Sequence, residues 1–453
     1  MFINRSDLIA DNVPRLHYGI AVTDADADGQ FEFLVAGFGT RNLMLKWDGT
    51  QYVDWGRNDL ADNGRQAIGI AAADIDADGY EEIYILNTDT FSGAKTLGDR
   101  LFDYVDGEHT DLFEVPRHQN SVNMTAGRSV AAIDRFGSGK YGFFVANYGG
   151  PMRLYELDVD ANLNDVAYEA GVDLTTGGRG LLPLPLVTQQ MDIFAGNENG
   201  ANFLFQNNGD GTFSDVALDV GVDDPFEHVR GIAALDVGSK YFALVYGNWN
   251  STHRLFTPST DGIWDDIAPP KMAEPSPIRT VIAADFDNDG YQEIFFNNIG
   301  APNRLFGFRQ GAWVQMDAGD AIEPEGFGTG AAVADLDGDG RLELLVAHGE
   351  QVRQPLSLFQ TRANDNHWLR VLPKTQYGAP ARGAIVRISA NGRTQQRVID
   401  AGSGYLCQME PVAHFGLGTA NTVDEMTVRW LDGKTHVVTN PSIDTLHTIT
   451  YPD

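Results

Sequence analysis

Apolar residues of this chain occur in short runs that are separated by acidic or glycine-rich turns. One run, residues 128–133, leads into an acidic turn, and a second run, residues 141–146, follows it. A third run opens with arginine, leucine and an aromatic residue, as at Arg100, and a fourth ends in Asp-Val-Ala, as at Asp215. Short runs rich in β-branched and aromatic residues and bounded by turn residues are typical of strands. The pattern therefore predicts a unit of four strands.

This unit repeats along the chain. The first acidic position of the turns recurs with separations of 50, 60, 102, 49 and 50 residues, at Asp24, Asp74, Asp134, Asp236, Asp285 and Asp335. The separation of 102 residues spans two periods, and its missing member lies near Pro185, where the acidic turn is lost. Seven such units predict an all-β fold, a seven-bladed β-propeller over residues 1–360, because radial repetition protects the sheet edges. Either the segment after Gln360 or residues 1–16 is available to help close the ring.

Four of the turns follow the phrase D-x-D-x-D-G-x-x-E. Alternate carboxylates in a tight turn converge on one side of it, and the glycine supplies the positive φ that the bend needs. Ca²⁺ takes about six to eight oxygen ligands, so the phrase predicts calcium sites, about four ions in all. The predicted ligands are Asp24, Asp26, Asp28, Glu32, Asp74, Asp76, Asp78, Glu82, Asp285, Asp287, Asp289, Glu293, Asp335, Asp337, Asp339 and Glu343.

These loops differ from EF-hands, which need a bidentate glutamate at loop position twelve and a helix on each side. Position twelve is apolar in all four loops, at Val35, Ile85, Phe296 and Val346. We therefore place each loop in a β-hairpin, with its ninth residue as the fourth carboxylate. The alternative is that aspartate and glycine only form turns there. The turns at Asp134 and Asp236 keep one carboxylate each, so we do not expect them to hold metal.

Four arginines stand six residues before the anchor position of their repeats, at Arg128, Arg179, Arg230 and Arg279. In a propeller these positions lie near the channel mouth on the face opposite the acidic turns, close to the loops of Tyr148, Trp249 and His348. Converging guanidinium groups in an acidic protein predict a local anion site, and a concave site with convergent polar groups is the default ligand site. The alternative is that each arginine only stacks under a neighbouring blade.

From residue 361 the acidic loops stop, whereas alternating runs continue, as in residues 383–389, 395–399 and 426–430. This change predicts a second, smaller domain over residues 361–453.

These features resemble two known families. Residues 15–360 are similar to the FG-GAP/VCBS calcium-binding repeats of propellers such as integrin α-subunits, with Phe327-Gly328 and residues 300–302 (GAP) as the namesake pieces. The series HWLRV, SGYL, HFGLG and VRW resembles the ASPIC/UnbV domain that follows such repeats in the cartilage acidic protein 1 family. The resemblance implies a small β-sandwich and an adhesion-like role. Arg382 and Cys407 depart from that domain's pattern, in which an apolar residue and a serine are expected.

The charge balance narrows the choice of partners. Lys and Arg number 32 against 63 Asp and Glu, a formal net charge of −31, so we expect no nucleic acid partner and no membrane insertion. No apolar run is long enough to cross a bilayer, and the first residues lack the apolar core of a signal peptide. The single cysteine excludes an internal disulfide framework. Calcium sites favour an extracellular or periplasmic location, whereas the start of the sequence leaves a cytoplasmic one open.

Sequence signatures of catalysis are few. The chain has no G-x-S-x-G elbow, no H-E-x-x-H and no phosphate loop, so no catalytic residue is assigned, and we expect His367 and His414 to be structural. We expect a calcium-binding interaction module that recognises a protein or a glycan, or an anionic small molecule at the channel mouth. The alternative is an enzyme of the lyase, dehydratase or cyclase type that uses the arginine-lined mouth, with calcium in a structural role.

Overall fold

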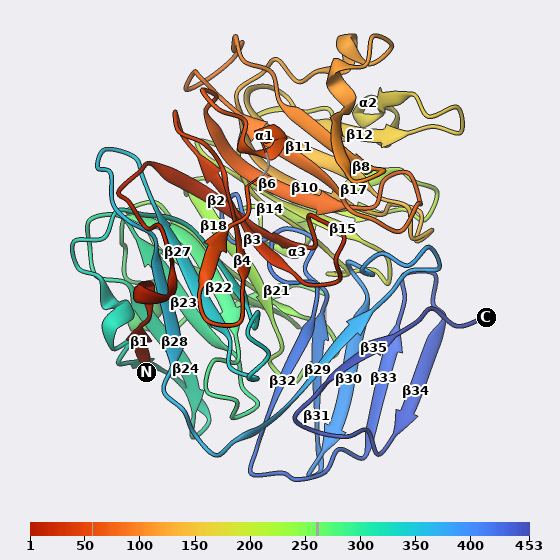
Figure 1. The fold of residues 1–453 in the computed structure, drawn as a ribbon. Coiled ribbons are helices and arrows are strands. Elements are labelled where there is room, and N and C mark those ends of the chain that lie inside the picture. The colour runs from red at the N-terminus through yellow and green to blue at the C-terminus, as the bar shows by residue number, and fades with distance from the viewer. Residues whose placement is uncertain (57, 260–261) are drawn as a thin grey trace.

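The computed structural model describes residues 1–56, 58–259 and 262–453, which form a propeller and a sandwich of β-strands (Figure 1). Among the described residues the propeller has seven antiparallel blades of four strands each, and the third and fourth blades form one continuous sheet because residues 142–151 also pair with residues 175–184. From the innermost strand outward, the blades are β2 (His17–Thr23), β3 (Glu32–Gly37), β4 (Leu43–Trp47) and β5 (Tyr52–Asp54); β6 (Ala67–Ala73), β7 (Glu82–Asn87), β8 (Arg100–Val105) and β9 (Glu108–Asp111); β10 (Gly127–Ile133), β11 (Gly142–Pro151), β12 (Arg153–Leu157) and β13 (Leu163–Asp165); β14 (Thr175–Leu184), β15 (Asp192–Asn197), β16 (Phe203–Asn207) and β17 (Phe213–Asp215); β18 (Val229–Leu235), β19 (Ala243–Asn248), β20 (Arg254–Pro258) and β21 (Trp264–Asp266); β22 (Ile278–Ala284), β23 (Glu293–Asn298), β24 (Arg304–Arg309) and β25 (Ala312–Met316); and β26 (Gly328–Ala334), β27 (Glu343–His348), β28 (Ser357–Thr361) and β1 (Phe2–Asn4).

The innermost strands contact one another in an unbroken circle, β2, β6, β10, β14, β18, β22 and β26, and the last of them contacts β2 again. These strands are rich in alanine and glycine because they meet around a narrow axis. The strand β6, for example, reads AIGIAAA and is buried at each position. The prediction of an all-β, seven-bladed propeller is therefore confirmed.

The N-terminal strand closes the ring. Phe2 pairs with Thr361, and Asn4 pairs with Phe359, so β1 becomes the outermost strand of the seventh blade. The Phe2 side chain is fully buried and packs edge-on against Phe286 of the neighbouring blade. Of the two segments that the sequence offered for closure, the structure uses residues 1–16.

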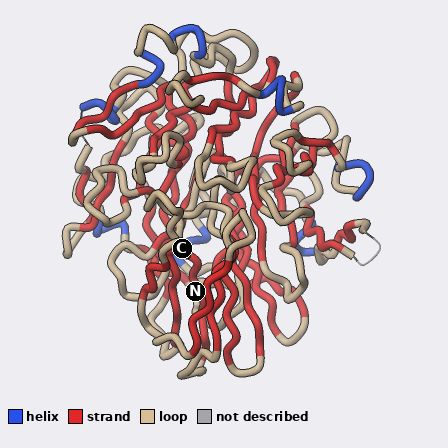
Figure 2. Tube along the Cα trace, turned by 90° about the vertical axis from the view of Figure 1, so that its right-hand side faces the viewer, coloured by secondary structure: helices blue, strands red, loops and turns tan. Residues whose placement is uncertain are grey.

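Short helices lie at the outer parts of the blades (Figure 2). They are α1 (Asn58–Ala61), α2 (Ala167–Ala170), α3 (Ala217–Val220) and α4 (Pro270–Ala273), with the 3₁₀ helices η1 (Ser6–Leu8), η2 (Leu112–Glu114), η3 (Gln119–Ser121) and η4 (Asp320–Ile322). In the part of the chain that the structure describes, no helix has the length and apolar character needed to span a membrane.

The C-terminal part is a small β-sandwich, as the family resemblance implied. One sheet contains β32 (Ala413–Gly418), β29 (His367–Pro373) and β35 (Leu446–Ile449), and the other contains β31 (Arg393–Val398), β30 (Ile385–Ala390), β33 (Glu425–Arg429) and β34 (Thr435–Thr439). The two sheets share a core to which Leu369 and Phe415 contribute from one side and Val386 and Met426 from the other.

Between β31 and β32, residues 400–410 leave the sandwich and run into the axis of the propeller; we call this segment the plug. Its backbone exchanges two hydrogen bonds with Ile232 of β18 through Gly404, at 2.6 and 2.7 Å. The amide group of Gln408 bonds to both backbone groups of Ala72 in β6, at 2.8 and 3.0 Å. A Cβ atom at Gly19 would clash with the carbonyl oxygen of Leu406, so β2 needs glycine there. The plug thus supplies the axis with hydrogen-bond partners.

The sandwich covers the propeller face that carries the acidic loops (Figure 1). Arg370 donates to Asp335 at 2.9 Å, and Gly416 N donates to Asp285 at 2.9 Å. Arg382 is fully buried and donates to Glu81 at 2.6 Å. The departure of Arg382 from its family's pattern therefore has a physical reason, because it is an ion-pair partner between the two domains.

Candidate functional site

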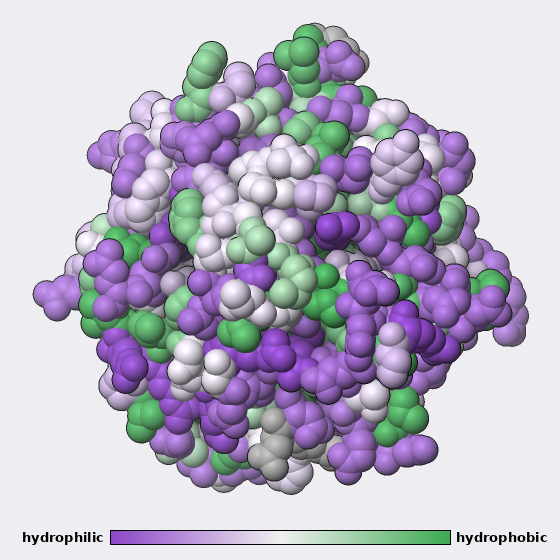
Figure 3. Space-filling model, turned by 90° about the horizontal axis from the view of Figure 1, so that it is seen from above, coloured by the Kyte–Doolittle hydropathy of each residue, from purple (hydrophilic) through white to green (hydrophobic). Residues whose placement is uncertain are grey.

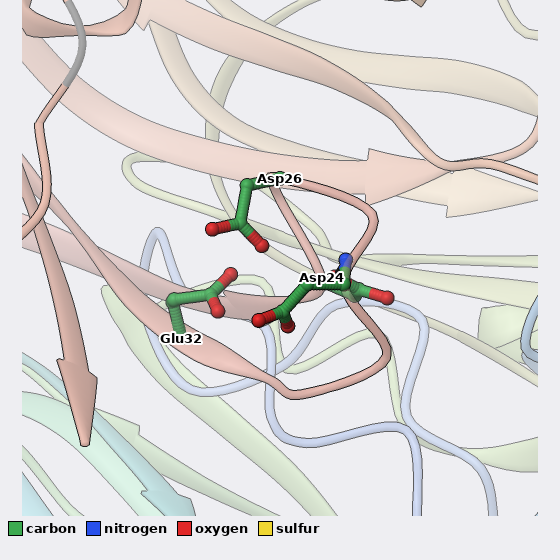
Figure 4. A group of neighbouring side chains, drawn as sticks. Asp24, Asp26 and Glu32 are labelled. Atoms are coloured by element: carbon green, nitrogen blue, oxygen red, sulfur yellow. Dashed lines mark hydrogen bonds between the residues drawn. The ribbon is translucent and has the colours of Figure 1, made fainter. Parts of the chain in front are cut away.

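Each of the four predicted acidic loops joins the two innermost strands of its blade. Oxygen atoms of three or four carboxylates lie within 4.8 Å of one another in each loop. Figure 4 shows Asp24, Asp26 and Glu32 turned toward one point in the loop between β2 and β3. The four clusters are Asp24, Asp26, Asp28 and Glu32; Asp74, Asp76 and Asp78; Asp285, Asp287 and Asp289; and Asp335, Asp337 and Asp339. Four acidic clusters that could hold a metal ion are therefore present where the phrase predicts them.

The glutamate that ends each phrase has a second task. One of its oxygens accepts a hydrogen bond from the backbone N–H that follows the first aspartate, at distances of 2.5–3.1 Å. The glutamates are Glu32, Glu82, Glu293 and Glu343, and all four are buried. One glutamate oxygen thus holds the turn, and the other faces a different partner in each blade.

The third strand of the blade decides what each cluster faces. In the first blade, Nζ of Lys46 lies 2.8 Å from Asp26, 2.7 Å from Asp28 and 3.2 Å from Glu32. In the second blade, Asp103 of β8 joins Asp76 and Glu82 and adds a further carboxylate. A lysine ammonium therefore neutralises the first cluster, whereas the second becomes more acidic.

The sixth and seventh blades also differ. Arg309 of β24 donates to Asp287 at 2.8 Å and to Glu293 at 2.7 Å. In the seventh blade the residue at this level is Gln360, whose amide lies 3.0 Å from Glu343 and carries no charge. Sequence reasoning missed these side chains because they lie far from the acidic phrase along the chain.

Burial raises the pKa of the closing glutamate in all four loops, to about 8 for Glu32 in the first blade, so the electrostatic difference between the loops lies in their aspartates. Burial, with repulsion from Asp76 and Asp78, raises the pKa of Asp74 to about 7 and the pKa of Asp103 to about 6. Burial also raises the pKa of Glu82 well above its ordinary value. In the first blade, burial alone would raise the pKa of Asp28, but Lys46 brings it below the ordinary value.

Each of the four loops has a carboxylate oxygen that could bind a cation. Oε1 of Glu32, Oε1 of Glu82, Oδ1 of Asp285 and Oδ1 of Asp335 are buried and have no hydrogen-bond partner among the described residues. A buried carboxylate oxygen without a partner is costly, and a divalent ion is the ligand that would satisfy it.

The loops of the first and sixth blades each hold one basic side chain that contacts three of the four carboxylates. In the seventh blade Arg370 and Arg341 contact one carboxylate each, Asp335 and Asp339. The loops of the second and seventh blades therefore leave more of their carboxylates for calcium.

A cavity of about 450 Å³ opens at the channel mouth on the opposite face. It is lined by all four predicted arginines, Arg128, Arg179, Arg230 and Arg279, and by Trp249. Tyr148 stands beside it, with its ring 4.6 Å from the Arg179 guanidinium. His348 is not in the lining; it is buried on β27, with Nδ1 2.7 Å from the carbonyl oxygen of Pro355. The structure thus brings together six of the seven predicted residues.

The arginines are partly paired within the cavity. Arg179 and Arg230 share Glu198, and Arg279 donates to Glu350 at 2.6 Å. Arg279 and Arg128 also stack on aromatic rings of neighbouring loops, at 4.2 Å from Trp249 and 5.2 Å from Phe91. Stacking on a neighbouring blade was the alternative expected from the sequence, and it occurs alongside the shared cavity.

The plug forms the floor of this cavity through Tyr405 and Leu406. Burial alone would raise the pKa of the Tyr405 hydroxyl, but the guanidinium groups around it bring this pKa below its ordinary value. Sequence reasoning missed the place of Tyr405, because nothing in a sandwich motif indicates that its loop crosses to the far face of the propeller.

Comparison with known proteins finds a matching family for each part of the chain. Residues 374–453 match the ASPIC and UnbV family, and residues 285–346 match the FG-GAP-like repeat. The chain is 48% identical to cartilage acidic protein 1 of Xenopus tropicalis, over 97% of this chain and 74% of that protein. It is 48% identical to the human protein of that name, over 93% of this chain and 70% of that protein. A crystal structure of BBS1N in complex with ARL6DN covers 80% of this chain and 98% of its own, with a TM-score of 0.50 and 11% identity, which shows the fold alone.

Proposed function

The chain belongs to the cartilage acidic protein 1 family, and from this premise we propose that it is a calcium-binding propeller that serves as an extracellular interaction module for a protein or glycan ligand. The observation that carries the calcium part is the set of buried, unpartnered carboxylate oxygens in the acidic loops. The family and the concave, charged mouth support the recognition part.

Calcium binding assigns a role to each residue of a loop. In the second blade, Asp74, Asp76, Asp78, Glu82 and Asp103 would hold the ion. When bound, Ca²⁺ supplies a divalent charge that offsets the repulsion among these carboxylates and links the two strands of the hairpin. The chain itself shapes the turn, since Gly79 N donates to Asp74 at 3.1 Å and Tyr80 N to Asp78 at 2.9 Å.

The ion count follows from the third strands. We assign ions to the loops of the second and seventh blades. Those of the first and sixth blades bind an ion only if Lys46 or Arg309 moves away, so about two ions are expected per chain rather than the four that the phrase predicts. While Lys46 and Arg309 stay paired, each of these two loops holds a positive charge even when no calcium is present.

The two domains act as one rigid unit in this proposal, with residues 1–360 as the propeller and 361–453 as the sandwich. The sandwich covers the acidic face, and the plug fills the axis. The mouth with its arginines remains open on the other side, so we place ligand recognition there. On the face shown in Figure 3, hydrophilic residues predominate and hydrophobic ones are scattered.

Metal analysis combined with thermal unfolding tests the calcium part. Protein dialysed against calcium should retain about two ions per chain, and EDTA should lower its melting temperature. Magnesium is the control, because it demands a smaller octahedral site. A chain that binds no calcium and unfolds at one temperature in both buffers would falsify this part of the proposal.

One observation favours a second candidate, an enzyme of the lyase type. Tyr405 and the four arginines line one cavity, and the guanidinium charges bring the pKa of the Tyr405 hydroxyl below its ordinary value, which favours its phenolate. Such a phenolate can accept the proton from the carbon next to a bound carboxylate. The C–H electron pair then forms a carbon–carbon double bond, the β carbon–oxygen bond breaks, and the leaving oxygen takes up a proton from water or from the newly protonated Tyr405. Ultraviolet absorbance of the new double bond, lost in Tyr405→Phe, would support this candidate, and its absence with a glucuronate-containing oligosaccharide would exclude it.

A further inference from the structure

We infer that the mouth cavity binds an acidic sugar, a uronate, with its guanidinium groups on the carboxylate and its aromatic side chains against the sugar ring. This inference rests on the recognition role proposed above and names the ligand class for that role. It is independent of how many calcium ions the opposite face holds.

The charge of the cavity calls for an anion. Four guanidinium groups face three carboxylates, those of Asp89, Glu198 and Glu350. Among the described residues, the hydrogen-bond partners of Arg128 are all carbonyl oxygens, those of Thr90, Phe91 and Gly127. A site with surplus positive charge in a chain of net charge −31 attracts anions selectively.

The arginines are held rigidly and still have donors to offer. Arg128, Arg179 and Arg230 are 7%, 4% and 4% exposed. Their Nε–H groups, and that of Arg279, are buried without an acceptor within the described part of the chain, whereas Nη1 of Arg179 and Nη1 of Arg279 are not buried and make no hydrogen bond there. A planar guanidinium fork matches a planar carboxylate in a bidentate pair, so preorganised forks with free donors favour a carboxylate.

Aromatic rings alternate with these charges. Phe91 and Tyr148 lie beside Arg128 and Arg179, and Trp249 lies between Arg230 and Arg279 at 5.6 and 4.2 Å. Aromatic rings contribute apolar area with little entropy loss and pack against the flat C–H face of a ring. The alternation of forks and rings therefore suits a ligand that carries a carboxylate on a ring rather than an isolated inorganic anion.

The size of the cavity limits the ligand. Its volume of about 450 Å³ falls within the range of about 300–1,000 Å³ that is typical of small-molecule pockets. The plug closes the cavity from below with Tyr405 and Leu406. A sugar of one or two rings fits this space, and a longer glycan would enter by its end.

Saturation-transfer NMR in calcium buffer tests the inference with three probes: glucuronate, its neutral amide glucuronamide, and inorganic sulfate. We expect glucuronate to bind at least about tenfold more tightly than either of the others. Equal binding of glucuronate and glucuronamide would overturn the role of the guanidinium groups. Equal binding of glucuronate and sulfate would overturn the role of the sugar ring. A glucuronate-containing tetrasaccharide distinguishes a free sugar from the end of a glycan as the natural source.

Variants connect binding to the cavity. Arg128→Gln and, on the more exposed side, Arg279→Gln should each weaken glucuronate binding at least about tenfold. Arg304→Gln is the matched control, because Arg304 also stacks on aromatic rings, Phe296 and Phe306, but lies outside the lining. Unchanged binding in both cavity variants would overturn the inference. Melting curves of all variants with and without calcium report separately on the calcium proposal.

Discussion

The acidic loops of the first and second blades share one phrase but meet opposite side chains. Where the third strand passes the loop, the first blade has Lys46 and the second has Asp103. The two positions are equivalent, since each follows the residue that pairs with the second strand, Leu45 in β4 and Phe102 in β8. The comparison teaches that the phrase determines the shape of the turn, whereas the third strand determines its charge.

Removing calcium should have the largest effect on stability. We expect it to destabilise the second blade and not the first. Each ion stabilises the fold by about 2.7 kcal/mol when free calcium is about 100 times its dissociation constant. Calorimetric unfolding with and without EDTA measures the sum. Hydrogen exchange resolves it by blade, with faster exchange in β6 and β7 than in β2 and β3 as the expected result. Uniform loss of protection in all blades would contradict the difference.

Replacing Lys46 should make the acidic loop of the first blade resemble that of the second blade, where, among the described residues, no basic side chain pairs with the carboxylates. Lys46→Met leaves buried carboxylates without their cation, so we expect a loss of about 3 kcal/mol in EDTA. Calcium should restore this loss, and titration calorimetry should count one more ion per chain. Lys240→Met, at an exposed lysine of the fifth blade's turn, is the control. A variant that gains no ion would show that Lys46 does not govern this loop.

Neutralising the extra carboxylate should weaken the second loop. Asp103→Asn removes one charged ligand, so calcium affinity at that site should fall about tenfold. In EDTA the same variant should be slightly more stable, because one source of repulsion is lost. Glu156→Gln provides the matched control, since Glu156 occupies the same position beside a turn with a single aspartate and pairs with Arg135. Affinity equal to that of the unmodified chain would argue against Asp103 as a ligand.

Arg309→Met should produce the smallest change in stability. Arg309 and its partners Asp287 and Asp289 are 27%, 27% and 29% exposed, and only its third partner, Glu293, is buried. Water therefore screens two of its three ion pairs, and we expect a loss of about 1 kcal/mol in EDTA. The variant should still gain an ion at high calcium. Unfolding in denaturant measures the loss of stability, and metal analysis counts the bound ions. A loss larger than that of Lys46→Met would reverse the order proposed for the two loops.

The sequence was informative wherever a local pattern determines the structure. Apolar runs around Asp134 predicted the hairpin of β10 and β11, and the repeat spacing predicted the number of blades. The phrase around Asp76 predicted a convergent cluster because alternate residues of a tight turn share one side. The spacing of Arg128 and its counterparts likewise predicted a shared mouth, because equivalent positions of a propeller meet near its axis.

Contacts between distant segments could not be read in this way. Lys46, Asp103 and Arg309 belong to third strands, where a charged residue is usually only a solvated side chain. The place of Tyr405 depends on the path of a whole loop across the propeller, which no local period encodes. His348 ends its strand at the predicted level, yet its side chain turns toward Pro355, because a repeat position specifies a backbone location and not a rotamer.

The closing strand has a consequence for biosynthesis. Because β1 pairs with β28, the residues of β1 wait for a partner that is made about 355 residues later. The plug is synthesised later still, yet it occupies the axis around which the blades are arranged. Nascent blades therefore remain an open arc whose inner backbone groups, such as those of Ala72 and Ile232, lack their final partners. The plug, residues 400–410, supplies these partners only after all seven blades have been made, so the axis is completed by a segment of the sandwich and not by the propeller itself.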